Sequence, residues 1–400
     1  MSDLPPNPSP TVFIIAGEES GDLLGANLMR SLNDRFAGRV RFLGVGGTRM
    51  AQLGLASMFP MEEIVRHGIS DVLLHLPLLL RRIRQTAAAV VAARPDVLVL
   101  VDCPGFNLRV GRRVGASAPS IPIVDYVSPT VWAYFPGRAR KMARYVDQLL
   151  ALLPFEPAVH RKLGGPPTTY VGHPLVERMP SLAPLPGERA PLGHGRRPVL
   201  LVLPGSRRSE IRRLMESFGE TVAKVVQQVG PVELILPAVP RLAAEIRERA
   251  AKWPVRPTIV EGEVATYAAF RRAHAALAAS GTVTLELGLS GVPMVVAYRV
   301  DPILRPFTGW LQSKSFVLTN LILGSNVIPE YLDGAADPDT LATALVPLLS
   351  DTPQRRAQVG AFARLERIMA VDRGTPSSRA ADVVVKAMET RPARASASAA

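Results

Sequence analysis

The chain has 400 residues, which is more than one ordinary domain and predicts two. Its formal net charge of +13 indicates an anionic partner, such as nucleic acid, acidic lipid or a phosphorylated substrate. The single cysteine, Cys103, excludes an intrachain disulfide and favours a reducing compartment. Since no basic segment precedes the first apolar run and no stretch approaches ~20 apolar residues, we expect neither a signal peptide nor a spanning helix.

Short apolar runs alternate with helical patterns along the whole chain. Near-continuous Val, Ile and Leu strands, each followed by a helix, are typical of parallel sheets covered on both faces. The runs expected as strands are TVFIIAG, VRFLGVGG, DVLVLVD, IPIVDYVS, DQLLALLPF, PVLLVLPGS, VELILPAV, PTIVEG, AALAAS and PMVVAY. The predicted fold class is α/β, with two doubly wound Rossmann-like domains that face a central cleft.

A Pro- and Gly-rich stretch over residues 179–198 separates the two halves and is interpreted as a linker. Both ends of the chain have the composition of disordered tails. The expected divisions are a first domain over 11–178, a second over 196–365, C-terminal helices over 366–390 that pack back across the cleft, and tails over 1–10 and 391–400.

A glycine-rich turn, Gly17-Glu18-Glu19-Ser20-Gly21-Asp22, follows the first expected strand and opens a helix. Such a turn can bind a ligand through its backbone N–H groups. It is not a Walker loop, because no Gly-Lys-Ser/Thr follows. The next turn, Gly44-Val45-Gly46-Gly47, has Arg49 where a dinucleotide fingerprint needs its third glycine, so a Rossmann dehydrogenase is disfavoured.

The third main strand ends at Asp102, which is followed by Cys-Pro-Gly-Phe-Asn. A carboxylate at the carboxyl end of a buried parallel strand is well placed for acid–base chemistry. The alternative is a structural role as the N-cap of a helix that begins near Leu108, and Asn107 could fill that role itself.

An aromatic and hydroxyl-rich segment, Tyr126 to Tyr134, follows the next strand and contains Ser128 and Trp132. It could stack on a sugar, contact an acyl chain or simply belong to the core. The basic helix after it, with Arg138, Arg140, Lys141 and Arg144, could meet phosphate or form a solvated face.

The segment from Asp71 to Arg94 has a leucine-rich front and a cluster of arginines. A basic amphipathic helix can lie in a membrane interface, but a core helix with a solvated face has the same pattern. Pro77 would bend this helix or mark its first turn. The candidate membrane contacts are Leu78, Leu79, Leu80, Arg81 and Arg82.

Two glycine turns in the second half are the most informative features. Gly205-Ser206-Arg207 follows the strand that ends at Leu203, and Ser280-Gly281-Thr282 opens a helix that carries Glu286. A helix start offers unpaired N–H groups and a positive dipole end, and glycine lets a ligand approach, so such turns can hold phosphate. One arginine and one carboxylate on paired turns indicate a nucleoside diphosphate, although each turn alone could be structural capping.

Two other patterns are given structural interpretations. Asp337-Pro338-Asp339 matches the D-x-D pattern of metal-dependent sugar transferases, but the apolar run after it favours a helix cap. The six histidines lack zinc spacing and cysteine partners, so we expect no metal and no cofactor.

Taken together, these motifs resemble the lipid-A-disaccharide synthases, which are glycosyltransferases of the two-Rossmann (GT-B) type. The resemblance covers residues 12–330. It is carried by AGEESGDLLGANLMRSL, GVGGTRM, YVSPTVWAYFPGRARKMARYVDQLLALLPFEP, YVGHPL, LPGSRRSEI, ASGTVTLELGLSGVPMVVAYR and TNLILG.

The resemblance implies an inverting, metal-independent enzyme that transfers diacylglucosamine from UDP-diacylglucosamine to diacylglucosamine 1-phosphate (lipid X). It implies association with the cytoplasmic face of the inner membrane, a possible homodimer and no nucleic-acid partner. Asn320 falls on a family Pro-Asn motif near the donor, although Thr319 replaces the proline. The expected substrate-binding residues are Gly17, Ser20, Gly21, Ser128, Trp132, Gly205, Ser206, Arg207, Ser280, Gly281, Thr282, Glu286, Arg299 and Asn320.

The sequence departs from the family at one catalytic position. Many members have Asp-x-Pro-Asp-Phe-Asn after the third strand, and here Gly105 replaces the second aspartate. The candidate bases are therefore Asp102, then Asp22 and Glu18 in the glycine loop. The rival hypotheses are a UDP-N-acetylglucosamine epimerase, a peptidoglycan-precursor transferase and a basic nucleic-acid-binding protein; the last is weak because the charge is not concentrated in a recognisable module.

Overall fold

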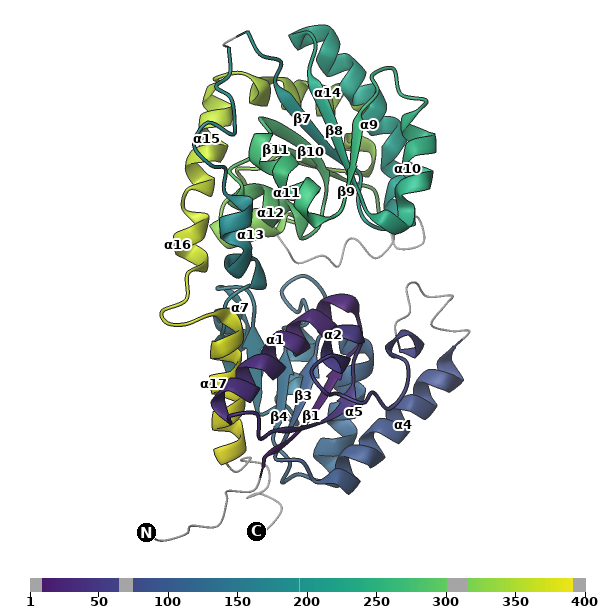
Figure 1. Ribbon diagram of the computed structural model, residues 1–400, viewed down its shortest axis with the longest axis vertical. Coiled ribbons are helices and arrows are strands. Elements are labelled where there is room, and N and C mark those ends of the chain that lie inside the picture. Colours follow the sequence, from purple (N-terminus) through teal and green to yellow (C-terminus); the bar gives the residue numbers. More distant parts are fainter. Residues whose placement is uncertain (1–8, 65–74, 194, 301–314, 391–400) are drawn as a thin grey trace. The chain divides into compact units, whose positions relative to one another are not determined.

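A computed structural model describes residues 9–64, 75–193, 195–300 and 315–390 (Figure 1). The chain divides into two compact units, Met1–Pro174 with Val371–Ala400, and Leu175–Ala370. The residues interpreted from sequence as a linker, 179–198, lie within the second unit, where the Arg189 guanidinium donates to the carbonyl oxygens of Phe270, Ser290 and Gly291. The expected tails, 1–10 and 391–400, lie almost wholly outside the described residues.

The first unit is built on a parallel sheet in the order β2-β1-β3-β4-β5-β6. Its strands are β1 (Thr11–Ala16), β2 (Arg41–Val45), β3 (Val97–Val101), β4 (Ile123–Tyr126), β5 (Gln148–Ala151) and β6 (Thr168–Tyr170). Its α-helices are α1 (Glu19–Arg35), α2 (Thr48–Ala51), α4 (Leu76–Ala93), α5 (Pro104–Ser117), α6 (Gly137–Met142), α7 (Glu156–Leu163) and α17 (Pro376–Glu389).

Both faces of this sheet are covered, as the near-continuous apolar strands predict. Val12 and Ile14 belong to a core with α1 and α17, and Phe13 and Ile15 belong to a core with α4 and α5. Helix α17 comes from the far end of the chain and packs against α1 and β3 (Figure 1).

The second unit repeats the plan with a parallel sheet in the order β12-β11-β10-β7-β8-β9. Its strands are β7 (Val199–Leu203), β8 (Glu233–Ala238), β9 (Thr258–Glu261), β10 (Ala275–Ala279), β11 (Met294–Tyr298) and β12 (Glu330–Leu332). Its α-helices are α8 (Met179–Leu182), α9 (Arg208–Val229), α10 (Ala243–Ala250), α11 (Glu263–Arg272), α12 (Val283–Leu289), α13 (Leu318–Leu323), α14 (Pro338–Leu345), α15 (Pro353–Phe362) and α16 (Leu365–Met369).

The α/β class and the two doubly wound sheets are thus confirmed. The ten strands expected from apolar runs are all present, but the three-residue edge strands β6 and β12 were not predicted. Both are too short and too exposed to give an apolar run, with none of their residues fully buried.

Three local predictions are decided by the structure. Asp337 caps α14, because its carboxylate accepts from the N–H groups of Asp339 and Thr340. Pro77 lies in the first turn of α4, as one of its two interpretations required. The helix after Asp102 begins at Pro104 and not near Leu108, so the proposed N-cap role of Asn107 was wrong; proline is well suited to the first helical position.

Candidate functional site

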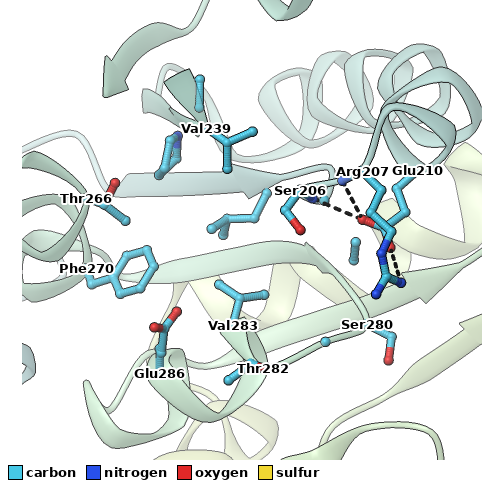
Figure 2. Close-up of a pocket in the computed structure, with 16 residues that line it drawn as sticks. Ser206, Arg207, Glu210, Val239, Thr266, Phe270, Ser280, Thr282, Val283 and Glu286 are labelled. Carbon is cyan, nitrogen blue, oxygen red and sulfur yellow. Dashed lines mark hydrogen bonds and ion pairs between the residues drawn. The ribbon is translucent and has the colours of Figure 1, made fainter. Parts of the chain in front are cut away.

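In the sheet of the second unit, the strand order reverses between β7 and β10. Strands β8 and β9 lie on one side of β7, and β10, β11 and β12 lie on the other. Ligands of doubly wound sheets bind outside the carboxyl ends of the strands at such a switch point. The turns after these two strands line one pocket of about 400 Å³, shown in Figure 2. The predicted residues in its wall are Gly205, Ser206, Arg207, Ser280, Gly281, Thr282 and Glu286.

Another part of the pocket wall comes from residues outside the two turn motifs. Pro237 and Ala238 end strand β8, which lies next to β7, and Val239 follows it, while Thr266 and Phe270 come from α11 (Figure 2). The strand order alone brings these elements to the switch point. The apolar surface that they supply suits a flat ring, and the glycine turns supply the polar side.

The glycine turn after β7 differs from its sequence interpretation in one respect. Its backbone N–H groups are not free, because Glu210 Oε2 accepts from the N–H of Ser206 at 3.0 Å and of Arg207 at 3.1 Å. Glu210 Oε1 also lies 3.6 Å from Arg207 Nη1, so a carboxylate already occupies the anion position of this helix start (Figure 2). Glu210 stands three residues after Arg207, the spacing at which a glutamate side chain can reach back to the backbone N–H at the start of a helix, so the sequence could have indicated this contact.

The other turn presents a carboxylate inside the pocket. Burial raises the pKa of Glu286, while Arg178 counteracts that shift. The Tyr267 hydroxyl donates to Glu286 Oε1 at 3.5 Å, and Arg178 Nη1 donates to Tyr267 at 3.2 Å. Ser280 Oγ, in contrast, donates to the carbonyl of Phe316 at 2.7 Å and so helps to fix the turn itself.

Two of the substrate-binding residues predicted in the second unit, Arg299 and Asn320, are not among the residues that line this pocket. Arg299 donates to the carbonyl oxygens of Arg213 and Ala336, at 3.1 and 3.3 Å. Buried Asn320 exchanges two hydrogen bonds with the backbone of Ile328, at 2.9 and 3.0 Å. Both side chains hold loops of the second unit in place.

In the sheet of the first unit, the strand order reverses between β1 and β3, because β2 lies on one side of β1 and β3 on the other. The glycine loop meets Asp102 at this switch point. Burial, followed by the neighbouring Glu18 carboxylate, raises the pKa of Asp102, and a hydrogen bond from Ser20 opposes the shift. Gly17 permits this approach, because a Cβ at its position would lie 2.5 Å from Cys103 Cβ. Three predicted residues are therefore brought together: Glu18, Ser20 and Asp102.

Asp22 has a different environment from Asp102, although both were candidate bases. It is 4% exposed, and its carboxylate accepts from the N–H groups of Gly47, Arg49 and Met50 at 2.8, 2.9 and 3.2 Å. It therefore caps the start of α2 from a distant position in the chain. Gly21 packs on the carbonyl of Val101, within 3.4 Å of where its Cβ would be.

Ser128 and Trp132 belong to a buried polar group after β4. Ser128 Oγ lies 2.8 Å from His160 Nε2, and Trp132 Nε1 donates to Glu156 Oε1 at 3.3 Å. Burial raises the pKa of Glu156 to about 7 and lowers the pKa of His160 to about 4. The hydrogen bond from the indole N–H to Glu156 fixes the orientation of Trp132.

The candidate membrane residues lie on the first turns of α4 and differ in exposure. Leu80 is 36% exposed and Arg81 is exposed, whereas Leu78 and Leu79 are half-buried and Leu79 packs on the core. Arg82 forms an ion pair with Glu63 at 2.7 Å, so it is engaged within the unit. Residues 71–74 of the predicted segment lie outside the described residues.

Two features are absent from the part of the chain that the structure describes. None of their helices is long and apolar enough to cross a membrane. Within the same residues, no group of three or more His, Cys, Asp or Glu side chains is arranged to hold a metal ion.

Solved structures with the same architecture share little sequence with this chain. A co-structure of Staphylococcus aureus MnaA with UDP covers 96% of this chain and 99% of its own, with a TM-score of 0.61 and 14% identity. Acinetobacter baumannii MurG covers 95% of this chain and 100% of its own, with a TM-score of 0.59 and 12% identity. These likenesses establish the fold.

Sequence relatives are far closer. The chain is 51% identical over 391 residues to a lipid-A-disaccharide synthase of Nitrobacter hamburgensis, covering 96% of each chain. It is 42% identical over 384 residues to one of Rhodospirillum centenum, covering 95% of each. A family model described as lipid-A-disaccharide synthetase matches residues 12–380. With this match across both sheets and the pocket at the second switch point, the chain belongs to the lipid-A-disaccharide synthase family and is a glycosyltransferase with the GT-B fold.

Proposed function

We propose that this chain transfers diacylglucosamine from UDP-diacylglucosamine to the primary hydroxyl of lipid X, giving a β-linked disaccharide 1-phosphate and UDP. The observation that carries the proposal is the near-full-length identity of 51% to a lipid-A-disaccharide synthase. The pocket at the β7–β10 switch point supports it, because two glycine turns, Arg207 and the Glu286 carboxylate meet there.

The donor is assigned to the second unit. Arg207 contacts the diphosphate, and the turn from Ser280 to Thr282 offers backbone N–H groups at the start of α12. Glu286 accepts from the ribose hydroxyls, for which its place inside the pocket is suitable. Phe270 and its apolar neighbours pack on the uracil ring.

The catalytic base is assigned to Asp102 in the first unit. Its carboxylate takes the proton of the acceptor hydroxyl while that oxygen attacks the anomeric carbon; the bond to the leaving diphosphate breaks and its electron pair leaves with UDP. A raised pKa moves this carboxylate toward the range where a base works at neutral pH. Asp22 ranks second because three N–H groups occupy its oxygens, and Glu18 acts through its charge beside Asp102.

The remaining substrate and membrane assignments follow from the family. Gly17, Ser20, Gly21, Ser128 and Trp132 belong to the acceptor side, and Arg299 and Asn320 support the donor side through the loops that they hold. The first turns of α4, with exposed Leu80 and Arg81, contact the cytoplasmic face of the inner membrane. A homodimer belongs to the same proposal.

Mass spectrometry of the products from UDP-diacylglucosamine and lipid X tests the reaction. We expect a tetraacyl disaccharide phosphate and one equivalent of UDP. UDP-N-acetylglucosamine without acyl chains serves as the matched control and should give little product. Equal use of the unacylated sugar, or epimerisation without transfer, would overturn the proposal in favour of another GT-B sugar-nucleotide enzyme.

A further inference from the structure

Asn107 makes an unusual set of contacts beside the switch point of the first unit. It is fully buried in α5, and its Nδ2 lies 2.8 Å from the carbonyl oxygen of Asp102, 3.0 Å from that of Val101 and 3.2 Å from that of Ile15. These three acceptors fix the side-chain orientation, because the opposite amide orientation would place an oxygen against three oxygens. One amide group therefore joins the ends of β1 and β3.

The backbone that Asn107 holds is strained. Asp102 and Cys103 both adopt left-handed conformations, with φ of 52° and 46°. Two consecutive non-glycine residues in this region cost free energy, and such strain persists only where surrounding contacts hold it in place. The carbonyl of Asp102 is one of the three groups that Asn107 binds, so this contact opposes relaxation of the turn.

The oxygen of the Asn107 amide differs from the nitrogen. Its Oδ1 is buried and has no hydrogen-bond partner among the described residues. A buried acceptor without a donor is destabilising, so packing alone would favour an apolar side chain here. The Nδ2 donor is therefore the part of the Asn107 side chain that stabilises this site.

We infer that Asn107 is a positioning residue for the transfer reaction: it holds the left-handed turn at Asp102 and Cys103 so that the Asp102 carboxylate faces the acceptor hydroxyl. This rests on the proposed role of Asp102 as base. Asn107 itself donates to the backbone carbonyl oxygens of Val101 and Asp102 and acts through the Asp102 carboxylate.

Asn107→Ala is the main variant, and two independent measurements are made on it. The first is steady-state kinetics, where we expect kcat to fall tenfold or more while KM for the UDP-sugar changes less than threefold. The second uses Cys103, the single cysteine of the chain, as a reporter of the turn. Burial raises its pKa to about 11, so its reaction with iodoacetamide is slow and should become at least fivefold faster in the variant.

Thr86→Ala is the control, because Thr86 is a buried polar residue of the same unit that donates to the Arg82 carbonyl within α4. It should lower the thermal midpoint without changing kcat or the Cys103 rate. If Asn107→Ala does not fold, Asn107→Asp replaces it; this variant keeps the shape but sets oxygens against three carbonyls, and the same two changes are expected.

The outcomes separate the possible roles of Asn107. Faster Cys103 labelling with unchanged kcat would show a purely structural role and overturn the inference, and so would a fall in kcat without faster labelling. A wild-type chain that makes no disaccharide would refute the proposed function instead. The labelling rate would then still decide whether Asn107 holds the turn, and an unchanged rate would overturn the inference.

Discussion

Replacement of Arg207 by alanine tests the nucleotide site most directly, because the structure shows which partner the arginine would leave behind. The Arg207 side chain is 67% exposed and lies 3.6 Å from Glu210, whose own side chain is 11% exposed. Removing the guanidinium therefore takes an attractive charge away from a bound diphosphate. The Glu210 carboxylate beside the turn remains and repels the diphosphate in both proteins.

The size of the effect follows from the lost attraction. A charge-assisted contact contributes roughly 1.5–3 kcal/mol, and the exposure of Arg207 calls for the lower end because water screens the charge. Repulsion between the Glu210 carboxylate and the diphosphate, about 1 kcal/mol at ~5 Å in water, is present with or without Arg207 and does not add to this loss. The loss is therefore about 1.5 kcal/mol, so Arg207→Ala should weaken UDP binding roughly tenfold.

Isothermal titration calorimetry with UDP measures this loss, and a second variant measures the repulsion from Glu210. Glu210→Gln keeps an oxygen for the N–H groups of Ser206 and Arg207 but removes the charge. Alone it should tighten UDP binding about twofold to fivefold, and in the Arg207→Ala background it should recover a similar factor. The loss in Arg207→Ala should shrink as ionic strength rises, because salt screens exposed charges.

The reasoning would be refuted by a folded Arg207→Ala variant that binds UDP within twofold of wild type. It would also be refuted if Glu210→Gln weakened binding, because the carboxylate would then act as a ligand or an essential brace. Thermal unfolding of each variant checks that the second unit stays intact.

Three further predictions concern the first unit and its relation to the membrane. Asp102→Asn should lower kcat about 10²–10⁴-fold and leave UDP affinity unchanged, whereas a near-normal rate together with a collapsed rate in Asp22→Asn would move the base to the glycine loop. Leu80→Glu should reduce flotation with anionic vesicles while Leu185→Glu, at a 65% exposed leucine of the second unit, should not; equal flotation would exclude α4 as the contact. Burial raises the pKa of Glu156 to about 7, so between about pH 4.5 and pH 7 the folded state retains a proton that the unfolded state loses, and the contribution of Glu156 to stability should fall as the pH rises through this range. Glu156→Gln should remove this slope from the pH dependence of the free energy of unfolding, and an unchanged slope would contradict the burial argument.

The amino-acid pattern was enough to predict the class of fold and most of its helices and strands. Near-continuous apolar runs such as VLVLV predict buried parallel strands. A strand covered on both faces has no side chains that face water, so every position can be apolar. The sequence also located the two turns of the second unit, because glycine at a strand-to-helix junction can adopt the positive φ that a tight turn requires. Gly205, with φ of 113°, is such a position.

The partners of the polar side chains depend on contacts that form only when the chain folds. Asp22 binds backbone groups more than twenty residues away, and Asn107 joins two strands that are far apart in the chain. Arg299 and Asn320 were expected at the ligand but bind carbonyl and amide groups of neighbouring loops. No local pattern encodes these partners, because a hydrogen-bonding side chain has the same composition and spacing whether its acceptor is a ligand or a backbone that only folding brings within 3 Å.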